Sequence, residues 1–300
     1  MTLPRPVFPG RFLFITRRCT QRQFLLRPDA ETNNNYTYCL GEAAARFEMD
    51  VVLSQMMANH HHTAVYDRHG HEVEFRQHFH NMTAKAENSL RGRWENMWSS
   101  DPACVIEVVT AEDLLEKLVY IATNPVKDNL VERVHHWPGP NFVAALLTGK
   151  PMRAHRPRHF FRSTGSMPAE IELVLKLPDD FEGKDALLAQ LRRRIKEVEE
   201  ACARERAATG RRVLGRRRVM RQSWRDNPAS HEPRRGLRPT VAARSRWLRI
   251  SMLQRKQEWQ LEYRSAYLQF RAGFAVEFPY GTYWFHRFAN VRVKPPPEAN

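Results

Sequence analysis

The chain lacks closely spaced cysteines and lacks any run of about 18 apolar residues, the length that a membrane span needs. Its cysteines, Cys19, Cys39, Cys104 and Cys202, are scattered, which favours neither a zinc knuckle nor a disulfide framework and fits a reducing cytoplasm. The amino-terminal segment has no leading cationic stretch and no cleavage site typical of a secretory signal. We therefore expect a cytoplasmic chain with no membrane partner, whose 42% hydrophobic residues suffice for a core.

Lysine is scarce as well, because only nine of the 48 basic residues are Lys and the other 39 are Arg. The net charge of +15 is also unevenly placed. Residues 1–150 contain 16 basic and 17 acidic residues, whereas residues 151–300 carry a net charge of +16. A GC-rich genome would explain Arg in place of Lys, but not this one-sided charge. Since Arg binds phosphate through two parallel hydrogen bonds, we predict a polyanionic partner, of which nucleic acid is the simplest.

Hydrophobic periodicity predicts alternating strands and helices in the first half of the chain. Strands are expected over residues 10–19, 50–57, 60–67 and 103–109. Helices are expected over residues 33–48, 72–94 and 110–126. The last helix opens with a capping pattern, Thr110 followed three residues later by Asp113, and is expected to end at Pro125. This order predicts an α+β fold, in which helices cover one mostly antiparallel sheet.

Segments rich in Pro, Gly and Arg at residues 137–141 and 148–159 indicate a domain boundary. We predict one domain over residues 1–147 and a basic, largely helical region over residues 148–300. Within the second region, helices are expected over 184–206 and 246–273, an irregular Arg-rich stretch over 210–239, and a strand and turn over 274–285.

Three consecutive histidines, His60, His61 and His62, begin the strand expected over residues 60–67. Side chains alternate across a strand, so His60 and His62 should face one side of the sheet and His61 the other. Two imidazoles about 7 Å apart along a strand can converge on one metal ion. Three surface histidines at the start of a strand are an equally good interpretation of these residues alone.

Two further histidine pairs have the same spacing. His78 and His80 lie in an expected helix, where residues two apart diverge by about 200°. His69 and His71 lie in a turn that does little to fix them. Strand geometry therefore favours His60 and His62 as the metal-binding pair.

The helix expected over residues 110–126 adds two groups that could act with these histidines. Tyr120 and Asn124 are four residues apart and so share one helical face. Asn124 offers a carbonyl oxygen as a metal ligand, and Tyr120 offers a nucleophilic phenol. Two imidazoles and one amide oxygen would suit Mg²⁺ or Mn²⁺, and the nitrogen ligands favour tolerance of Mn²⁺. Taken alone, a core tyrosine and an asparagine at a helix end would be the simpler interpretation.

These residues carry a resemblance to a known family. The sequence "MANHHH" (57–62) is similar to the M-x-N-H-hydrophobic-H motif of HUH single-strand endonucleases, and "YIATNPV" (120–126) resembles the Y-I-x-x-N-P-V of REP-associated tyrosine transposases. The segments 15–19, 38–47, 80–98 and 137–139 agree as well, so the resemblance covers roughly residues 10–140. One position departs from it, because His61 stands where HUH proteins usually have a hydrophobic residue.

The resemblance implies a ferredoxin-like α+β fold and a metal-dependent attack on single-stranded or hairpin DNA. His60, His62 and Asn124 would hold Mg²⁺ or Mn²⁺ against the scissile phosphate. Tyr120 would attack phosphorus, giving a 5′-phosphotyrosine and a free 3′-OH, and another 3′-OH could reverse the step. The protein could form a homodimer, in which Tyr120 acts either in its own subunit or in the partner's, and the sequence leaves this question open.

The charge distribution suggests which residues bind DNA. Candidates for phosphate contacts are Arg17, Arg18, Arg211, Arg212, Arg216, Arg217 and Arg218. Trp224, Trp247 and Trp259 could stack on unpaired bases, although core packing explains tryptophans at least as well.

Three functions fit these features. The first is a transposase-like strand transferase that acts on single-stranded or hairpin DNA. The second is a domesticated protein that recognises hairpins with little catalysis. The third is a replication-initiator nickase of the same superfamily, against which stands the lack of a helicase-type P-loop.

Overall fold

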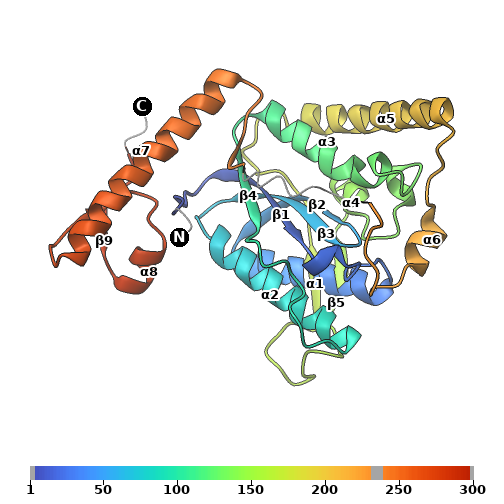
Figure 1. Ribbon diagram of the computed structural model, residues 1–300, viewed down its shortest axis with the longest axis horizontal. Helices are drawn as coiled ribbons and strands as arrows, with labels where there is room; N and C mark the ends of the chain where they lie inside the picture. Colours follow the sequence, from blue (N-terminus) through green and yellow to red (C-terminus); the bar gives the residue numbers. More distant parts are fainter. Residues whose placement is uncertain (1–3, 231–238, 298–300) are drawn as a thin grey trace.

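A five-stranded sheet lies at the centre of the computed structural model, which describes residues 4–230 and 239–297 (Figure 1). Its strands run in the order β2-β3-β1-β4-β7. Their bounds are Arg11–Arg18 for β1, Met49–Met56 for β2, His60–Asp67 for β3, Cys104–Val108 for β4 and Val241–Ala242 for β7. Neighbouring strands are antiparallel except for β4 and β7, which are parallel.

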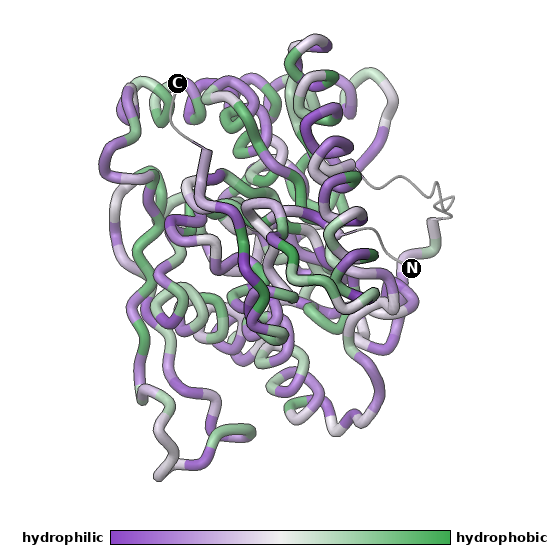
Figure 2. The backbone as a smooth tube through the Cα atoms, turned by 90° about the vertical axis from the view of Figure 1, so that its left-hand side faces the viewer, coloured by the Kyte–Doolittle hydropathy of each residue, from purple (hydrophilic) through white to green (hydrophobic). Residues whose placement is uncertain are grey.

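Helices cover both faces of this sheet (Figure 1). One face carries α1 (Ala30–Arg46) and α2 (Glu72–Arg91), and the other carries α3 (Ala111–Lys127). The order β1-α1-β2-β3-α2-β4-α3, with the strand order 2-3-1-4, is the ferredoxin-like arrangement followed by one more helix. The predicted α+β fold class is therefore confirmed. Hydrophobic and hydrophilic residues alternate along the helices (Figure 2), as expected for helices that bury one side.

The ends of the elements follow from local capping. Asp29 accepts a hydrogen bond from the Thr32 backbone N–H, so α1 begins three residues before the expected start. Thr110 caps α3 through the backbone N–H of Asp113, as predicted. The prediction that Pro125 ends α3 is wrong, because the helix continues to Lys127. Proline lacks only its own N–H, which costs one hydrogen bond near a helix end and does not prevent a last half-turn.

Segments beyond residue 147 add to the same core. A hairpin of β5 (Met152–His155) and β6 (Glu170–Leu173) packs on α1, and α5 (Lys184–Thr209) packs along α3 (Figure 1). Two short helices complete this part, α4 (Phe142–Thr148) before the hairpin and α6 (Arg216–Arg221) after α5. One hydrophobic core contains residues from both sides of residue 147. Whether residues 1–147 fold as a domain of their own stays a prediction.

The last part of the chain forms an arm beside this body, at the left of Figure 1. We call residues 246–297 the C-terminal arm. It comprises α7 (Arg246–Arg271), β8 (Glu277–Phe278), α8 (Trp284–Ala289) and β9 (Arg292–Val293). A small core of its own, centred on Ala266, Phe278 and Val291, holds these elements together. In the described parts of the chain, no helix combines the length and the apolar character needed to span a bilayer.

The arm is tied to the amino-terminal segment that leads into β1. The Val7 backbone N–H donates to the Gly281 carbonyl oxygen at 3.0 Å, and the ring of Phe8 stacks on that of Tyr280. Gly281 has a φ of +86°, and a Cβ atom there would come within 2.5 Å of the Phe8 ring. Only glycine therefore fits this contact without displacing Phe8.

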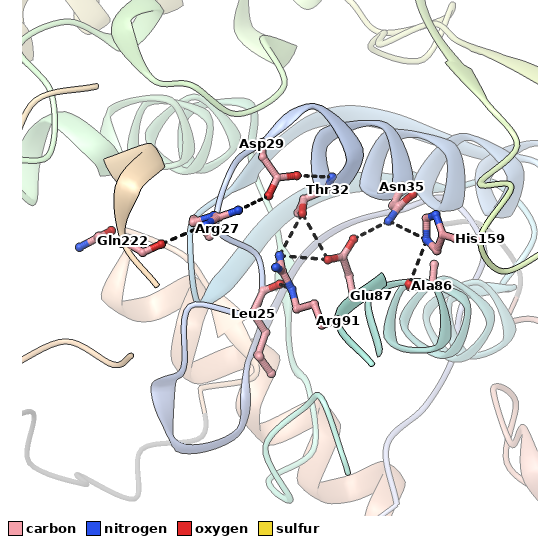
Figure 3. Close-up of polar contacts among 10 residues, drawn as sticks. All are labelled: Leu25, Arg27, Asp29, Thr32, Asn35, Ala86, Glu87, Arg91, His159 and Gln222. Atoms are coloured by element: carbon pink, nitrogen blue, oxygen red, sulfur yellow. Dashed lines mark hydrogen bonds and ion pairs between the residues drawn. The ribbon is translucent and has the colours of Figure 1, made fainter. Parts of the chain in front are cut away.

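A buried polar cluster joins α1 to α2 beneath the sheet (Figure 3). The Glu87 carboxylate accepts hydrogen bonds from Asn35 Nδ2 at 2.8 Å and from Thr32 Oγ1 at 3.3 Å, and lies 3.3 Å from the Arg91 guanidinium. Burial raises the pKa of Glu87 to about 7, although the charge of Arg91 acts against the shift. The desolvation cost thus exceeds the attraction within the pair.

The same cluster reaches the second half of the chain. Arg27 bridges Asp29 at the start of α1 and the carbonyl oxygen of Gln222, which follows α6 (Figure 3). On the other side, His159 lies against Asn35 and the carbonyl oxygen of Ala86. These bonds fix segments far apart in sequence to the same two helices.

We predict that Glu87 makes stability fall as pH rises. Its folded pKa lies above the ordinary value of 4.5, so the folded protein retains a proton that the unfolded chain releases, and this stabilisation is lost between about pH 4.5 and 7. Glu87→Gln should remove the effect. Urea unfolding at pH 5 and pH 8 should show the variant gaining about 2 kcal/mol relative to the wild type across that range. The exposed Glu205→Gln serves as control, and an equal change in both variants would contradict the assignment.

Candidate active site

Strand β3 divides its histidines between the two faces of the sheet. His60 and His62 face α3, with ring centroids 4.7 Å apart. His61 lies on the opposite face, where its ring packs against Phe79 and its Nε2 lies 2.9 Å from Nε2 of His80. The alternation expected from strand geometry is present, and it removes His61 from the neighbourhood of Tyr120 and Asn124.

The competing histidine pairs have other partners. His78 Nε2 lies 2.5 Å from Glu42 Oε2, whereas His80 is buried beside His61. His69 faces Glu48, and His71 Nδ1 lies near the carbonyl oxygen of Phe47. Neither pair converges on one point as His60 and His62 do.

Helix α3 brings Tyr120 and Asn124 to these imidazoles. The Tyr120 ring lies edge-on to the His62 ring at 5.1 Å and to the Phe14 ring at 6.1 Å, and it is 39% exposed. The Nδ2 atom of Asn124 lies 3.5 Å from Nε2 of His62. The structure thus gathers Tyr120, Asn124, His60 and His62, all four of the residues expected to form the catalytic and metal site.

The orientation of both imidazoles is set by hydrogen bonds that the sequence analysis did not anticipate. Asn59 Nδ2 donates to the carbonyl oxygen of Arg22, which turns Asn59 Oδ1 towards His60 Nδ1 at 2.7 Å. An amide oxygen only accepts, so His60 Nδ1 carries the proton and its Nε2 keeps a lone pair. His62 Nδ1 lies 2.9 Å from Thr16 Oγ1, a hydroxyl that can donate or accept and that holds the orientation of the ring. Asn59 lies within the motif that carries the family resemblance, but Thr16 gave no signal of its own.

Burial keeps the two imidazoles neutral. It lowers the pKa of His60 to about 4, with the charges of Arg18 and Arg22 adding to the effect. It lowers the pKa of His62 well below the ordinary value, and here the neighbouring histidines add to it. A neutral imidazole with a free lone pair is the form that binds a metal ion, so no proton has to leave before binding.

These residues fit a divalent cation by one further observation. Asn124 Oδ1 is buried and has no hydrogen-bond partner among the described residues, which is costly for a carbonyl oxygen unless something binds it. No group of three His, Cys, Asp or Glu side chains forms a metal site within residues 4–230 and 239–297. The candidate set differs because its third ligand is an amide. Two nitrogens and one oxygen suit Mn²⁺, or Mg²⁺ with water and phosphate oxygens as further ligands.

Two lysines share the helical face of Tyr120 and were missed by the sequence analysis. On an α-helix, Lys117, Tyr120, Asn124 and Lys127 fall within about 80° of one another. Lys117 Nζ lies 5.1 Å from the centroid of the Phe14 ring, and Lys127 Nζ lies 5.9 Å from that of Tyr120. Their spacing from Tyr120, three residues before and seven after, could have identified them. Positive charge there attracts phosphate.

The Trp137–Pro138–Gly139 segment supports the turn that precedes the histidines. The indole N–H of Trp137 donates to the carbonyl oxygen of Met56 at 2.9 Å. The carbonyl oxygen of Pro138 accepts a hydrogen bond from Asn33 Nδ2. A Cβ atom on Gly139 would come within 2.4 Å of the Trp137 ring. The segment therefore needs glycine in order to place the indole beneath the end of β2.

These residues open onto a cleft of about 2200 Å³. Its walls include His60, His62, Tyr120 and Asn124 on one side and residues of the C-terminal arm on another. Arg17 and Arg18, at the end of β1, line the cleft as well. The guanidinium of Arg17 lies 5.8 Å from the Trp98 ring, so this arginine is partly committed to packing.

The other predicted DNA-binding arginines lie beside the cleft and not in its wall. They are Arg211, Arg212, Arg216, Arg217 and Arg218, and all five are exposed. Their segment is tied to the loop that follows α3, because the backbone N–H groups of Leu214 and Gly215 donate to the carbonyl oxygens of Asn129 and Leu130, each at 2.9 Å. The structure thus brings the Arg-rich segment next to the helix that carries Tyr120.

The three tryptophans considered for base stacking have different surroundings. Trp224 is half-buried, with the guanidiniums of Arg91, Arg93 and Arg225 within 4.9–5.9 Å of its ring. Trp259 is buried, and its indole N–H donates to the carbonyl oxygen of Tyr280. Trp247 is 79% exposed. Packing thus accounts for Trp224 and in large part for Trp259.

Comparisons with known proteins find two solved structures of related description. One, a REP-associated tyrosine transposase bound to a REP hairpin, is 16% identical over 56% of this chain and 96% of its own, with a TM-score of 0.42. The other, from Deinococcus radiodurans R1 and provisionally assigned as a transposase, is 15% identical over 39% of this chain and 93% of its own, with a TM-score of 0.30. No protein-family model and no curated protein matches the chain.

We predict that Thr16→Val weakens metal binding at the site. The substitution keeps the shape of the side chain but removes the hydroxyl that orients His62, and the loss of such a partner typically costs about 10- to 100-fold in metal affinity. Isothermal titration with Mn²⁺ in the absence of DNA would measure it. Thr148→Val removes an exposed hydroxyl at the end of α4 and should leave the affinity unchanged. An unchanged affinity in Thr16→Val would show that His62 is held by other contacts.

Proposed function

We propose that this chain is a transposase-like endonuclease and strand transferase that cleaves single-stranded DNA through Tyr120. The observation that supports it best is the convergence of Tyr120 on His60, His62 and the unpartnered carbonyl oxygen of Asn124. A partly exposed phenol beside a set of metal-ligating groups, at the floor of a cleft, is what a nucleophile needs in order to reach a phosphodiester.

The reaction is a displacement at phosphorus. Tyr120 Oη forms a bond to the phosphorus atom, the bond from phosphorus to the 3′ oxygen breaks, and the leaving oxygen takes up a proton to become a free 3′-OH. The 5′ end stays on the protein as a phosphotyrosine diester. The energy of the broken bond is kept in the new one, so the 3′-OH of another strand can attack it and join without ATP.

The residues of the chain divide the remaining work. His60, His62 and Asn124 would hold a divalent cation, which supplies Lewis-acid polarisation and orientation of the scissile phosphate. Lys117 and Lys127 attract the phosphate. Asn59 keeps His60 in the tautomer that a metal ligand requires, and Thr16 keeps the ring of His62 in its orientation.

Hairpin or repeat DNA is the substrate class that we propose. The solved structure of the REP-associated transposase is bound to a REP hairpin, and a single strand that folds back supplies both a duplex to recognise and unpaired nucleotides to cleave. The nearly neutral first half suits the reaction site, whereas the surplus of arginine in the second half suits contacts to the phosphates of such a substrate. A hairpin binder with little catalysis and a replication-initiator nickase would be distinguished by the reaction products.

We predict that a covalent bond forms between Tyr120 and DNA. Incubation with Mn²⁺ and labelled single-stranded DNA should give a slowly migrating protein band on a denaturing gel. A 3′ label should stay on the protein, whereas a 5′ label should leave with the free 3′-OH. Tyr120→Phe removes only the hydroxyl, so the band should vanish while DNA binding persists.

Two controls sharpen this experiment. Tyr66→Phe changes another partly exposed tyrosine, on β3 but not among the residues that line the cleft, and should leave the band intact. A chelator should abolish the band in the wild type. A band that survives in Tyr120→Phe would refute the assigned nucleophile, and binding without any band in the wild type would favour the hairpin binder.

A second prediction concerns the Arg-rich segment next to α3. Replacing Arg216, Arg217 and Arg218 with Gln should weaken binding of single-stranded DNA and flatten its salt dependence by up to about 2 units of slope, since each phosphate contact contributes about 0.7. Fluorescence anisotropy at several salt concentrations would measure the slope. Replacing Arg192, Arg193 and Lys196 on α5 lowers the net charge equally and serves as control. Equal slopes in the two variants would mean that only overall charge matters.

A further inference from the structure

We infer that the face of the C-terminal arm that lines the cleft is a stacking surface for the single strand that enters the site of Tyr120. This inference rests on the proposed function and assigns it a binding surface. It concerns a part of the chain that lies beyond the residues carrying the family resemblance. Its evidence is the arrangement of aromatic and cationic side chains on α7 and α8.

The aromatic side chains follow one line of α7. Trp259, Tyr263 and Tyr267 are spaced four residues apart, which places successive rings about 6 Å apart along one helical face. The rings of Trp259 and Tyr263 stack with centroids 5.2 Å apart. The helix α8 continues this surface, because the Phe285 ring lies 5.6 Å from that of Tyr267. All four residues line the same cleft as Tyr120.

The end of this surface is accessible to a ligand. Trp284, next to Phe285, is 50% exposed and also lines the cleft. Tyr263 and Tyr267 are half-buried, because they also pack against the small core of the arm, and both line the cleft. Aromatic side chains that present faces or edges to a groove take stacked bases without regard to sequence, since every base has a π-face.

Charge identifies the occupant as an anion. The residues that line the cleft include seven Lys or Arg but only two Asp or Glu. On α7 itself, Lys256 and Arg264 stand on the same face as the aromatic line. Burial lowers the pKa of Lys256, and the repulsion from Arg5, which also lines the cleft, adds to this effect. A phosphate backbone between them would relieve the repulsion, whereas an apolar segment of a protein would not.

The arm holds a fixed position opposite the active site. Besides the contacts of Val7 and Phe8, Gln260 Nε2 donates to the carbonyl oxygen of Pro4 at 2.8 Å. Arg287 on α8 pairs with Glu74 on α2 at 3.4 Å. These bonds join both ends of the aromatic surface to the body, so the surface and Tyr120 form two walls of one groove. A strand bound between them would have its bases on the arm and its phosphates near Arg17 and Arg18.

The surface predicts how binding responds to substitution. Trp284→Leu should weaken binding of a fluorescently labelled oligothymidylate about five-fold or more, as expected for the loss of one stacked base. Replacing Lys256 and Arg264 with Gln should flatten the salt slope by about 1.4 units, since two phosphate contacts are lost. Anisotropy of the full chain in the presence of a chelator measures binding without cleavage. Circular dichroism should first confirm that each variant is folded.

Matched controls come from the same arm. Phe274→Leu removes a comparably exposed aromatic side chain outside the cleft, and Arg292→Gln removes an exposed cation on β9 that does not line the cleft. Both should bind the oligothymidylate as the wild type does. If Trp284→Leu and the Lys256/Arg264 variant also bind as the wild type does, the inference is overturned. Weakening by Phe274→Leu equal to that by Trp284→Leu would overturn it too, because the effect would not be specific to the cleft.

The outcome for the inference is separate from that for the proposed function. Weakened binding in the cleft variants supports the stacking surface even if no covalent band forms with Tyr120. A covalent band in the wild type together with unaffected binding in the variants rejects the surface and keeps the nuclease. Weakening of duplex binding to the same degree as that of the oligothymidylate would also reject the surface, since paired bases cannot stack on it.

Discussion

The alternation of side chains along β3 is the constraint on which the site depends. A strand places successive residues on opposite faces, so three consecutive histidines cannot act together. His60 and His62 are given to the face covered by α3, and His61 is used on the other face, where it bonds His80 within the core. The central position of β3, between β2 and β1, keeps this arrangement rigid. Every other feature of the site is arranged about the pair that remains.

Burial does more than hold the histidines in place. By removing water, it keeps the imidazoles neutral and leaves the Asn124 carbonyl oxygen without a partner among the residues that the structure describes. A buried carbonyl oxygen without a partner costs stability in the protein alone, and a bound cation would offset this cost. The Glu87 cluster shows the same balance away from the site, because there too desolvation outweighs an available ion pair. The buried polar groups around Glu87 hold α1 and α2 together. Those around Asn124 leave a carbonyl oxygen that could bind a cation.

The second half of the chain is built around the first half. Its hairpin β5–β6 packs on α1, its helix α5 on α3, and its Arg-rich segment bonds the loop after α3. The C-terminal arm then closes one side of the cleft. The uneven charge of the sequence thus has a spatial counterpart, since the nearly neutral first half is flanked by basic segments. Such an arrangement suits a polyanion whose phosphates contact the basic segments around the site more than the site itself.

Much of the fold could be predicted from periodicity, because the repeats of strands and helices are properties of the backbone within one element. All four strands of the ferredoxin-like part, and the helices α1, α2 and α3, were anticipated to within a few residues. The short elements α4, β5, β6 and α8 were not, since they are too brief to show a period and form only by packing on what precedes them. Pro125 was misjudged because a local rule about proline was applied at a helix end, where little depends on its missing N–H.

By itself the sequence determined which residues share a face, namely His60 with His62 and Tyr120 with Asn124, because their spacing within one element decides it. Only the tertiary structure decided that the two pairs meet, since β3 and α3 are brought together by the packing of the helix on the sheet. It also decided that Asn59 and Thr16 orient the imidazoles, and that an aromatic arm about 140 residues further along stands across the cleft from Tyr120. Such contacts join segments far apart in the chain and depend on the shape of the whole core, which no local pattern records.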